Sequence, residues 1–264
     1  LGVSQDKKTK VRIKEIQESY AKVEYIEKKV REELGSKPFL IQTKNLSPVT
    51  TTKKIIVEGN RIKPEVWVSQ IMKEFPNWIN SVFLPYRVQE KITKKDTEYT
   101  TYQKFVRDYL SMNSPYRGLL LYHGLGSGKT CTSIAIAENL KAEKNVVVLS
   151  PATLRNNYLT ALKTDKVCGN PAYRENESLI DEKYSFISYN ASNTIDQLDR
   201  IGSLDNHTIV IDEVHNLISM MVTKSKKGPE IYKRLMEAKN VKIVALSGTP
   251  IINYPFEIAL LANI

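Results

Sequence analysis

The chain has 264 residues, 41% of them hydrophobic, and a formal net charge of +10 at pH 7. It is long enough to bury a sizeable core in one or two domains, and its basic balance favours a polyanionic partner, nucleic acid before an anionic membrane. No apolar run approaches the roughly 18 residues of a membrane-spanning helix and no signal peptide is visible, so we expect an intracellular protein.

Two cysteines are present, Cys131 and Cys168. They lack metal-ligand spacing and cannot build a disulfide framework, so a reducing compartment fits them, and Cys131 is interpreted as a packed helix residue rather than a redox switch. The chain starts at Leu1 rather than Met. We therefore expect it to be a piece of a longer protein.

Residues 1–85 form the first predicted region, a basic and mainly helical extension. Apolar residues recur at steps of three and four from Val11 to Leu34, which favours one amphipathic helix that packs on a neighbour. Residues 36–64 are rich in Lys, Thr, Pro and Ser and predict a loop with one short strand from Lys54 to Val57. The two tryptophans follow in residues 66–83, which we interpret as a small packing module.

Residues 86–264 form the second predicted region, in which strands and helices alternate. The helix Gln103 to Leu110 comes first, and short apolar runs then predict buried strands at 118–122, 145–150, 184–189, 207–211 and 241–246. Helices fit between them, so the pattern predicts a doubly wound α/β domain with a parallel sheet covered by helices. Its ligand should bind at the carboxyl ends of the strands.

A glycine-rich turn joins the first of these strands to a helix that begins at Thr130. Its residues His123-Gly124-Leu125-Gly126-Ser127-Gly128-Lys129-Thr130 match a phosphate-binding loop, apart from His123 at the first position. Glycines let successive N–H groups point at one anion, and the helix start adds partial positive charge. Lys129 would reach the β- and γ-phosphates and the Thr130 hydroxyl would hold Mg²⁺. The loop predicts binding of a nucleoside triphosphate.

Two further motifs follow later strands. Asp212-Glu213-Val214-His215 comes directly after the strand 207–211, where Asp212 would hold Mg²⁺ and Glu213 would orient and deprotonate the attacking water. Ser247-Gly248-Thr249-Pro250 comes after the strand 241–246, and its small hydroxyl side chains can link the metal site to whatever lies across the cleft.

Together these motifs resemble motifs I, Ia, II and III of superfamily 2 helicases, with Ser150-Pro151-Ala152-Thr153-Leu154 as motif Ia. The likeness covers roughly residues 100–264. Residues 246–261 also resemble the Swi/Snf-type translocases, while residues 116–124 and 149–151 look most like the DNA-dependent ATPases of large DNA viruses. That group includes the poxvirus-type early transcription factor small subunit and nucleoside triphosphatase I.

The resemblance implies a RecA-like domain that uses ATP and Mg²⁺, and further residue roles. Gln103 would select adenine, with Gln89 as a competing candidate. Contacts with the nucleic-acid backbone would come from Ser150, Thr153 and Arg155, with Ser188 and Tyr189 as a further contact or simply a strand end. Coupling of nucleotide state to the nucleic-acid cleft would use His215, Ser247 and Thr249.

The resemblance also implies a second RecA-like domain, which carries an arginine that stabilises the transferring phosphoryl group. The chain ends at Ile264, 14 residues after Pro250, so we expect the second domain to be absent and hydrolysis by this chain alone to be weak. Partners would be nucleic acid, DNA before RNA, and a transcription complex, in the host cytoplasm or the virion of a virus. An ATP-binding interaction module that docks a partner through residues 1–85 is the alternative; a small-molecule kinase fits the motifs poorly.

Overall fold

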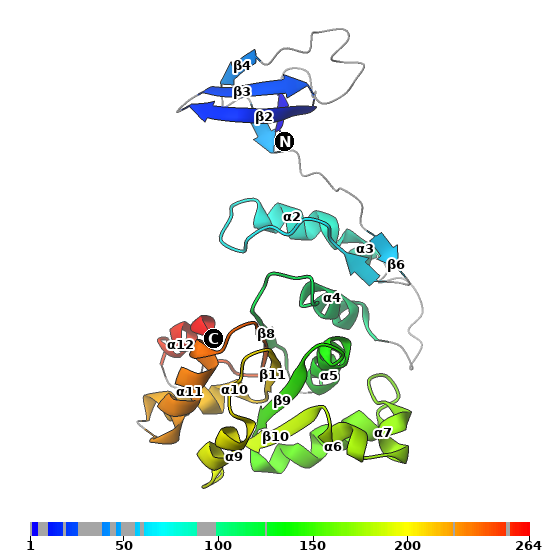
Figure 1. Ribbon diagram of the computed structural model, residues 1–264, viewed down its shortest axis with the longest axis vertical. Helices are drawn as coiled ribbons and strands as arrows, with labels where there is room; N and C mark the ends of the chain where they lie inside the picture. The colour runs from blue at the N-terminus through cyan, green and yellow to red at the C-terminus, as the bar shows by residue number, and fades with distance from the viewer. Residues whose placement is uncertain are drawn as a thin grey trace. The chain divides into compact units, whose positions relative to one another are not determined.

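We analysed a computed structural model of the chain (Figure 1). The structure describes residues 61–86, 99–124, 126–223, 225–251 and 254–264 in full, the backbone of residues 87–88, and the backbone of the strands before residue 61. The chain divides into two compact units, which we describe separately. Unit 1 comprises residues 1–56 and 64–82, and unit 2 comprises residues 57–63 and 83–264.

Unit 1 contains a five-stranded antiparallel sheet in the order β4-β3-β2-β1-β5. Its strands are β1 (Gly2–Ser4), β2 (Lys10–Gln17), β3 (Tyr20–Tyr25), β4 (Phe39–Gln42) and β5 (Leu46–Pro48). The predicted helix from Val11 to Leu34 is therefore wrong over β2 and β3, and its last part lies outside the described residues. Over its described residues, the extension is therefore not mainly helical.

The error has a physical cause in the periodicity. Val11 and Ile13 alternate with charged residues at a step of two, and Ala21, Val23 and Tyr25 do the same. The register pairs Val11 with Tyr25 and Ile13 with Val23, and a bulge follows Ile13. This irregularity shifts the apolar positions of β2 by one residue, which creates the apparent three- and four-residue steps of a helix.

The tryptophan-containing segment of unit 1 includes helix α2 (Phe75–Val82). Trp78 is 5% exposed, and its ring centroid lies 5.7 Å from that of Trp67 and 6.0 Å from that of Phe75. Tilted aromatic pairs at these separations add to the burial of apolar surface. The rings thus pack on one another, in agreement with the predicted packing module.

Unit 2 is built on a five-stranded parallel sheet in the order β10-β9-β11-β12-β8. The strands are β8 (Gly118–Tyr122), β9 (Asn145–Ser150), β10 (Tyr184–Ser188), β11 (His207–Ile211) and β12 (Lys242–Ser247). The three inner strands are buried almost throughout. The predicted α/β fold is confirmed, and each predicted apolar run matches a strand to within one residue.

Helices cover both faces of this sheet (Figure 1). The described helices of unit 2 are α3 (Leu84–Val88), α4 (Thr101–Tyr109), α5 (Lys129–Leu140), α6 (Arg155–Thr164), α7 (Pro171–Glu175), α8 (Ser178–Asp181), α9 (Thr194–Ile201), α10 (Val214–Val222), α11 (Lys227–Glu237) and α12 (Glu257–Asn263), with a 3₁₀ turn at Ala152–Leu154. Of these, α3 packs on α4, and α4 packs on α5. Alternate residues of β9, β11 and β12 form one core cluster with α9 to α12. Because side chains alternate along a strand, the remaining residues face the layer that contains α5.

Residues 57–63 belong to unit 2 although they precede the predicted boundary at residue 85. They include β7 (Arg61–Lys63), which pairs with β6 (Ile56–Glu58). The Ile62 N–H donates to Asp108 Oδ2 over 2.8 Å, and the Tyr86 hydroxyl donates to the same carboxylate, which is 1% exposed. A buried carboxylate requires such donors, and this need fixes β7 to α4.

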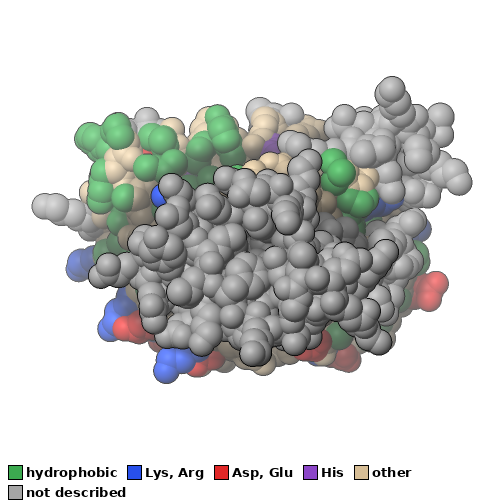
Figure 2. All heavy atoms as spheres, turned by 90° about the horizontal axis from the view of Figure 1, so that it is seen from above, with side chains coloured by type: hydrophobic (Ala, Val, Ile, Leu, Met, Phe, Trp, Pro, Cys, Tyr) green, Lys and Arg blue, Asp and Glu red, His purple; other side chains and the backbone are tan. Residues whose placement is uncertain are grey.

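Figure 2 shows one face of the molecule, where acidic and basic side chains are interspersed along the lower edge of the view. The described side chains that are visible along that edge therefore carry charges of both signs. Among the helices that the structure describes, none is both long and apolar enough to cross a membrane.

Candidate nucleotide-binding site

The predicted phosphate-binding loop connects β8 to α5 at the carboxyl edge of the parallel sheet. Gly126 has a φ of 75°, and Gly128, the residue before α5, has a φ of 79°. A side chain is strained in that region, so glycine is needed at both positions. The two left-handed residues turn the backbone into the first turn of α5, where free N–H groups and the helix dipole attract an anion.

Lys129 is the first residue of α5, and its side chain folds back across the loop. Its Nζ donates to the carbonyl oxygens of His123 over 2.7 Å and Gly124 over 3.2 Å. A Cβ at Gly248 would lie 3.7 Å from the same Nζ atom, and the His123 N–H donates to the Ser247 carbonyl over 3.3 Å. The end of β12 therefore lies directly beside the loop. This agrees with the prediction that Ser247-Gly248-Thr249-Pro250 follows a strand at the ligand-binding edge.

Asp212 and Glu213 follow β11 at the same edge. The Asp212 N–H donates to the Leu149 carbonyl over 2.8 Å, which extends the sheet by one residue. Glu213 has a φ of 49°, and its N–H donates to Asp212 Oδ1 over 3.0 Å. The left-handed backbone of a residue that is not glycine costs roughly 1 kcal/mol and often marks a functional position. It turns the chain from β11 into α10.

The Asp212 side chain is 8% exposed. Burial and then the neighbouring charge of Glu213 raise the pKa of Asp212 to about 6, while the Glu213 N–H and the Lys129 ammonium oppose this rise. The folded protein thus carries a carboxylate that is costly to ionise in the absence of a cation. Such a group is suited to hold a hard divalent ion, which favours the ionised form.

His215 connects Glu213 to the end of β12. Its Nδ1 lies 3.3 Å from Glu213 Oε2 and 2.9 Å from Ser247 Oγ, and the Thr249 N–H donates to Ser247 Oγ over 3.0 Å. Ser247 is fully buried. A chain of close contacts therefore runs from the Glu213 carboxylate through His215 and Ser247 to the backbone of Thr249, and it brings together the three residues for which coupling was predicted.

Gln103 lies on α4, next to the loop, and is 4% exposed. Its Oε1 accepts the Thr100 N–H over 2.8 Å as part of a capping box, and its Nε2 lies 3.2 Å from the position that a Cβ of Gly128 would take. The capping box fixes the orientation of the amide. Adenine selection by Gln103 stays a prediction, and the competing residue, Gln89, lies outside the described residues.

The three predicted nucleic-acid contacts differ in access. Ser150, at the end of β9, is 1% exposed, which argues against a direct contact through its side chain. Thr153 and Arg155 are exposed, and the Arg155 guanidinium lies 5.7 Å from the ring centroid of Phe186. A guanidinium held against an aromatic face keeps its remaining donors free for phosphate oxygens. Thr153 and Arg155 therefore remain the accessible candidates.

Two tyrosines support the site: Tyr102, for which the sequence predicted no role, and Tyr189, which it offered as a nucleic-acid contact or a strand end. The Tyr102 hydroxyl donates to the Ser127 carbonyl over 3.2 Å and lies 2.7 Å from Thr132 Oγ1. The Tyr189 hydroxyl lies 3.0 Å from the Asp212 carbonyl oxygen, which is therefore within hydrogen-bonding reach. Tyr189 is 1% exposed, which favours the strand-end interpretation over a backbone contact. Nothing in the residue types signalled these contacts, because they depend on which strands are neighbours.

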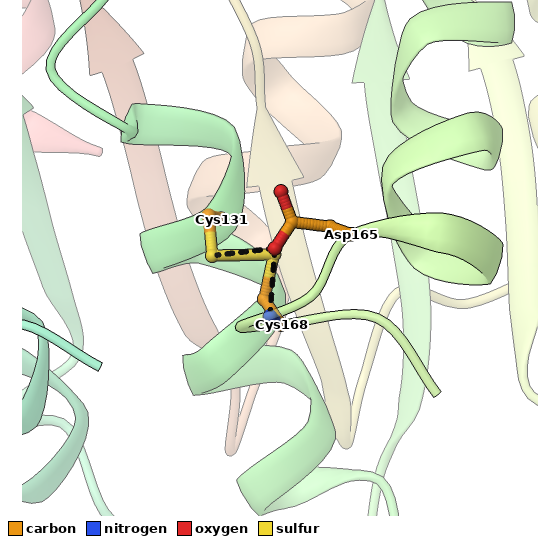
Figure 3. Close-up of side chains that lie close together, drawn as sticks. All are labelled: Cys131, Asp165 and Cys168. Carbon is orange, nitrogen blue, oxygen red and sulfur yellow. Dashed lines mark hydrogen bonds between the residues drawn. A yellow bond between two sulfur atoms is a disulfide. The ribbon is translucent and has the colours of Figure 1, made fainter. Parts of the chain in front are cut away.

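The cysteines also depart from expectation. Cys131 of α5 and Cys168, in the turn after α6, form a disulfide, with their Cα atoms 5.4 Å apart and Asp165 beside them (Figure 3). Of the described residues, these three form the one group whose spacing suits a metal ion. The interpretation of Cys131 as merely a packed helix residue is therefore wrong. Tertiary contacts join two cysteines that are 37 residues apart.

Comparison with known proteins gives several relatives. Two proteins of Acanthamoeba polyphaga mimivirus, each named "Putative ATP-dependent RNA helicase", are 32% identical over 191 residues and 33% identical over 220 residues. These matches cover 63% and 72% of this chain and 32% and 27% of the relatives. The "Termination factor NPH-I homolog" of African swine fever virus is 32% identical over 148 residues, 53% of this chain and 21% of that protein.

The chain thus spans about a third or less of the length of these curated relatives. Among solved structures, the Sulfolobus solfataricus SWI2/SNF2 ATPase core in complex with dsDNA aligns with a TM-score of 0.44 and 23% identity, over 62% of this chain and 35% of that one. The predicted resemblance to helicase-type proteins of large DNA viruses is confirmed by the viral relatives. Residues 69–252 match a family profile, and the chain belongs to the family described as "Type III restriction enzyme, res subunit".

Proposed function

We propose that residues 86–264 are the first motor domain of a nucleic-acid-dependent ATPase, a helicase or a translocase, and that residues 1–85 precede it as an extension. The carrying observation is the convergence of three motifs at one sheet edge. Lys129, Glu213 and Ser247 come from separate strand ends. The His123 N–H donates to the Ser247 carbonyl, which links the phosphate loop to the end of β12, and His215 contacts both Ser247 and Glu213. Convergence at the carboxyl ends of parallel strands is typical of a ligand site.

The donor set fits MgATP. The backbone N–H groups around Gly126, Ser127 and Gly128, with the Lys129 ammonium, would hold the phosphates. The Thr130 hydroxyl and the Asp212 carboxylate are hard oxygen ligands of the kind that Mg²⁺ prefers. Bound there, Mg²⁺ would neutralise charge on the β- and γ-phosphates.

Glu213 has the features of a general base. Its carboxylate lies 3.3 Å from His215 Nδ1, so its position is held from the side of β12. A carboxylate so placed can orient a water molecule toward the γ-phosphorus and accept its proton. Because His215 also contacts Ser247, a shift of the β12 end would move the base, and this supports the proposed coupling of hydrolysis to events across the cleft.

The proposed track is nucleic acid, with duplex DNA as our first choice and single-stranded DNA and RNA as alternatives. The exposed Thr153 and Arg155 would contact backbone phosphates, so we expect affinity to fall steeply with salt and to depend little on sequence. The resemblance places a charge-stabilising arginine in a second domain, and an arginine of that kind contributes about 10³–10⁵ in turnover. We therefore expect slow hydrolysis by the 264-residue chain itself.

The test measures MgATP binding and steady-state hydrolysis, with and without duplex DNA, beside Lys129→Ala. We expect saturable binding that Lys129→Ala weakens at least tenfold, because an ammonium bonded to phosphate oxygens contributes about 1.5–3 kcal/mol. Binding that survives the substitution would refute the nucleotide site. A different result is a longer form of the protein that binds MgATP tightly and yet shows no stimulation of ATP hydrolysis by nucleic acid. That result would instead favour the ATP-binding interaction module.

A further inference from the structure

The Cys131–Cys168 pair lies next to the proposed nucleotide site. Cys131 is the third residue of α5, directly after Lys129 and Thr130, and its partner lies in the turn that follows α6 (Arg155–Thr164). The Cα–Cα distance of 5.4 Å lies within the range that a disulfide spans. The bond therefore joins the turn that carries the phosphate-binding lysine to a separate loop (Figure 3).

The loop that carries Cys168 is held by contacts that do not require the disulfide. Asp165 Oδ1 accepts the N–H groups of Val167 over 2.7 Å and Cys168 over 3.0 Å. The Gly169 N–H donates to the Asp165 carbonyl over 3.0 Å, and a Cβ at Gly169 would lie 2.4 Å from that oxygen, so only glycine fits. The turn therefore keeps its shape whether or not the sulfur atoms are bonded, and α6, from which it continues, packs on α5.

Access to the two sulfur atoms differs. Cys131 is partly exposed, whereas Cys168 is 3% exposed. A soluble reagent would therefore meet Cys131 first, and Cys168 is placed to resolve the product. This arrangement, one accessible cysteine poised beside a buried partner, is the one that redox-responsive pairs require.

We propose that Cys131 and Cys168 are a reversible thiol–disulfide modification site that responds to low-molecular-weight disulfides and weakens MgATP binding when oxidised. The effect on MgATP depends on the proposed function, whereas the thiol chemistry does not. In the reaction, the Cys131 thiolate attacks a disulfide such as glutathione disulfide and releases one glutathione. The Cys168 thiolate then attacks the mixed disulfide at Cys131 and releases the second. The protein loses two electrons, the reagent gains them, and two glutathione thiols carry the two protons.

The effect on MgATP follows from the position of the bond. In the cross-linked arrangement Lys129 Nζ donates to the carbonyl oxygens of His123 and Gly124, and phosphate oxygens must compete with these contacts. The disulfide ties the same turn to the loop held by Asp165 and so restrains its adjustment around the phosphates. Reduction removes that restraint.

The experiment equilibrates the 264-residue chain with glutathione disulfide or with dithiothreitol. Free thiols are counted by the mass added by maleimide, and the Kd for MgATP is measured with a fluorescent nucleotide. We expect two thiols in the reduced chain, none in the oxidised chain, and a Kd at least threefold higher after oxidation, reversed by dithiothreitol. Cys131→Ser should abolish the difference. Cys168→Ser should stop at the mixed disulfide, detected as one glutathione added to the mass of the chain and removed by dithiothreitol.

Three results would overturn the proposal. Two thiols that persist under glutathione disulfide would show that the pair does not react. An unchanged Kd in the fully oxidised chain would remove the effect on MgATP. One equivalent of Zn²⁺ retained by the reduced chain, and lost in Cys168→Ser, would assign Asp165 and the two cysteines to a metal site instead. Absence of MgATP binding in both redox states, with normal thiol chemistry, would instead refute the proposed function.

Discussion

The two edges of the parallel sheet both hold lysine side chains, but they hold them differently. At the amino edge, Lys144 is 1% exposed and Lys242 is 6% exposed. Lys242 Nζ donates to the carbonyl oxygens of Ser114 over 2.5 Å and Tyr116 over 2.8 Å. At the carboxyl edge, Lys129 also donates to two carbonyl oxygens but remains partly exposed, on a turn built from glycine.

Arg117 shows the same static use of a cation at the amino edge. Its guanidinium donates to the carbonyl oxygens of Leu235, Ala238 and Ile264. Two of these acceptors lie at the end of α11, where cations complement the helix dipole. The cations of the amino edge thus donate hydrogen bonds to main-chain carbonyl oxygens near the ends of strands and helices.

The comparison indicates that burial and charged partners, rather than residue type, distinguish the structural lysines of the amino edge from Lys129, for which we propose a function. Burial, with a smaller contribution from the charge of Lys144, lowers the pKa of Lys242 to about 8, and its bonds go to main-chain oxygens. Lys129 instead interacts with the charge of Asp212 across the site. A cation that can exchange carbonyl oxygens for phosphate oxygens must lie on a turn that solvent reaches.

The largest expected effect at the carboxyl edge is that of Glu213→Gln. The amide keeps the size of the side chain but cannot accept a proton, so hydrolysis by the protein, or by a longer form that includes its partner domain, should fall about 10²–10⁴-fold. The Kd for MgATP should stay within threefold. Single-turnover hydrolysis and nucleotide binding, measured on the same preparation, check both. Unchanged turnover would remove Glu213 from the catalytic role.

Asp212→Asn should stabilise the chain at neutral pH while it weakens Mg²⁺-dependent ATP binding. A folded pKa of about 6, against 3.8 for an ordinary Asp, means that ionisation costs the folded state about 3 kcal/mol above pH 6. The free energy of unfolding of the unsubstituted protein should therefore fall as the pH rises from about 4 to 6. Urea unfolding should show a gain of up to about 3 kcal/mol at pH 7.5, and little gain at pH 4. An equal gain at both pH values would contradict this.

Lys242→Ala probes the amino edge. Two carbonyl oxygens lose their donor and the buried methylenes leave a cavity, while removal of a poorly solvated ammonium offsets part of the loss. We expect the free energy of unfolding to fall by about 1–3 kcal/mol with the Kd for MgATP unchanged. The exposed Lys239→Ala is the matched control and should change stability by less than about 0.5 kcal/mol. A higher Kd for MgATP in Lys242→Ala would contradict the proposed difference between the two edges.

The smallest expected effect is that of Tyr102→Phe. It removes only the hydroxyl that reaches Ser127 and Thr132, so stability should fall by about 0.5–1.5 kcal/mol. Because the lost bond supports the phosphate loop, the Kd for MgATP should rise by two- to fivefold. Thermal unfolding and nucleotide titration measure both. A loss of stability with no change in Kd would place Tyr102 with the structural residues of the amino edge.

The sequence by itself determined the order of strands and helices in residues 100–264 and the identity of the main site motifs. Those features are local. A run such as Val146-Val147-Val148 can only be stable when both faces are covered, and a glycine turn before Lys129 follows from backbone conformation alone.

The unit that precedes them shows where local reasoning failed. With a bulge after Ile13, the apolar residues between positions 10 and 25 recur every two residues, as in a strand. If no bulge is assumed, the same residues fit a helical period near 3.6. Only pairing between strands decides such a case, because main-chain hydrogen bonds to a neighbour select the strand.

Contacts between distant residues were likewise decided by the tertiary structure alone. The pairing of Cys131 with Cys168, the contacts from Glu213 through His215 to Ser247, and the burial of Lys242 each join or enclose residues that are far apart in the sequence. Their residue types occur on the surfaces of most proteins. What gives these residues their chemistry is the order of strands in the sheet, since that order decides which strand ends become neighbours and which charges lose their water.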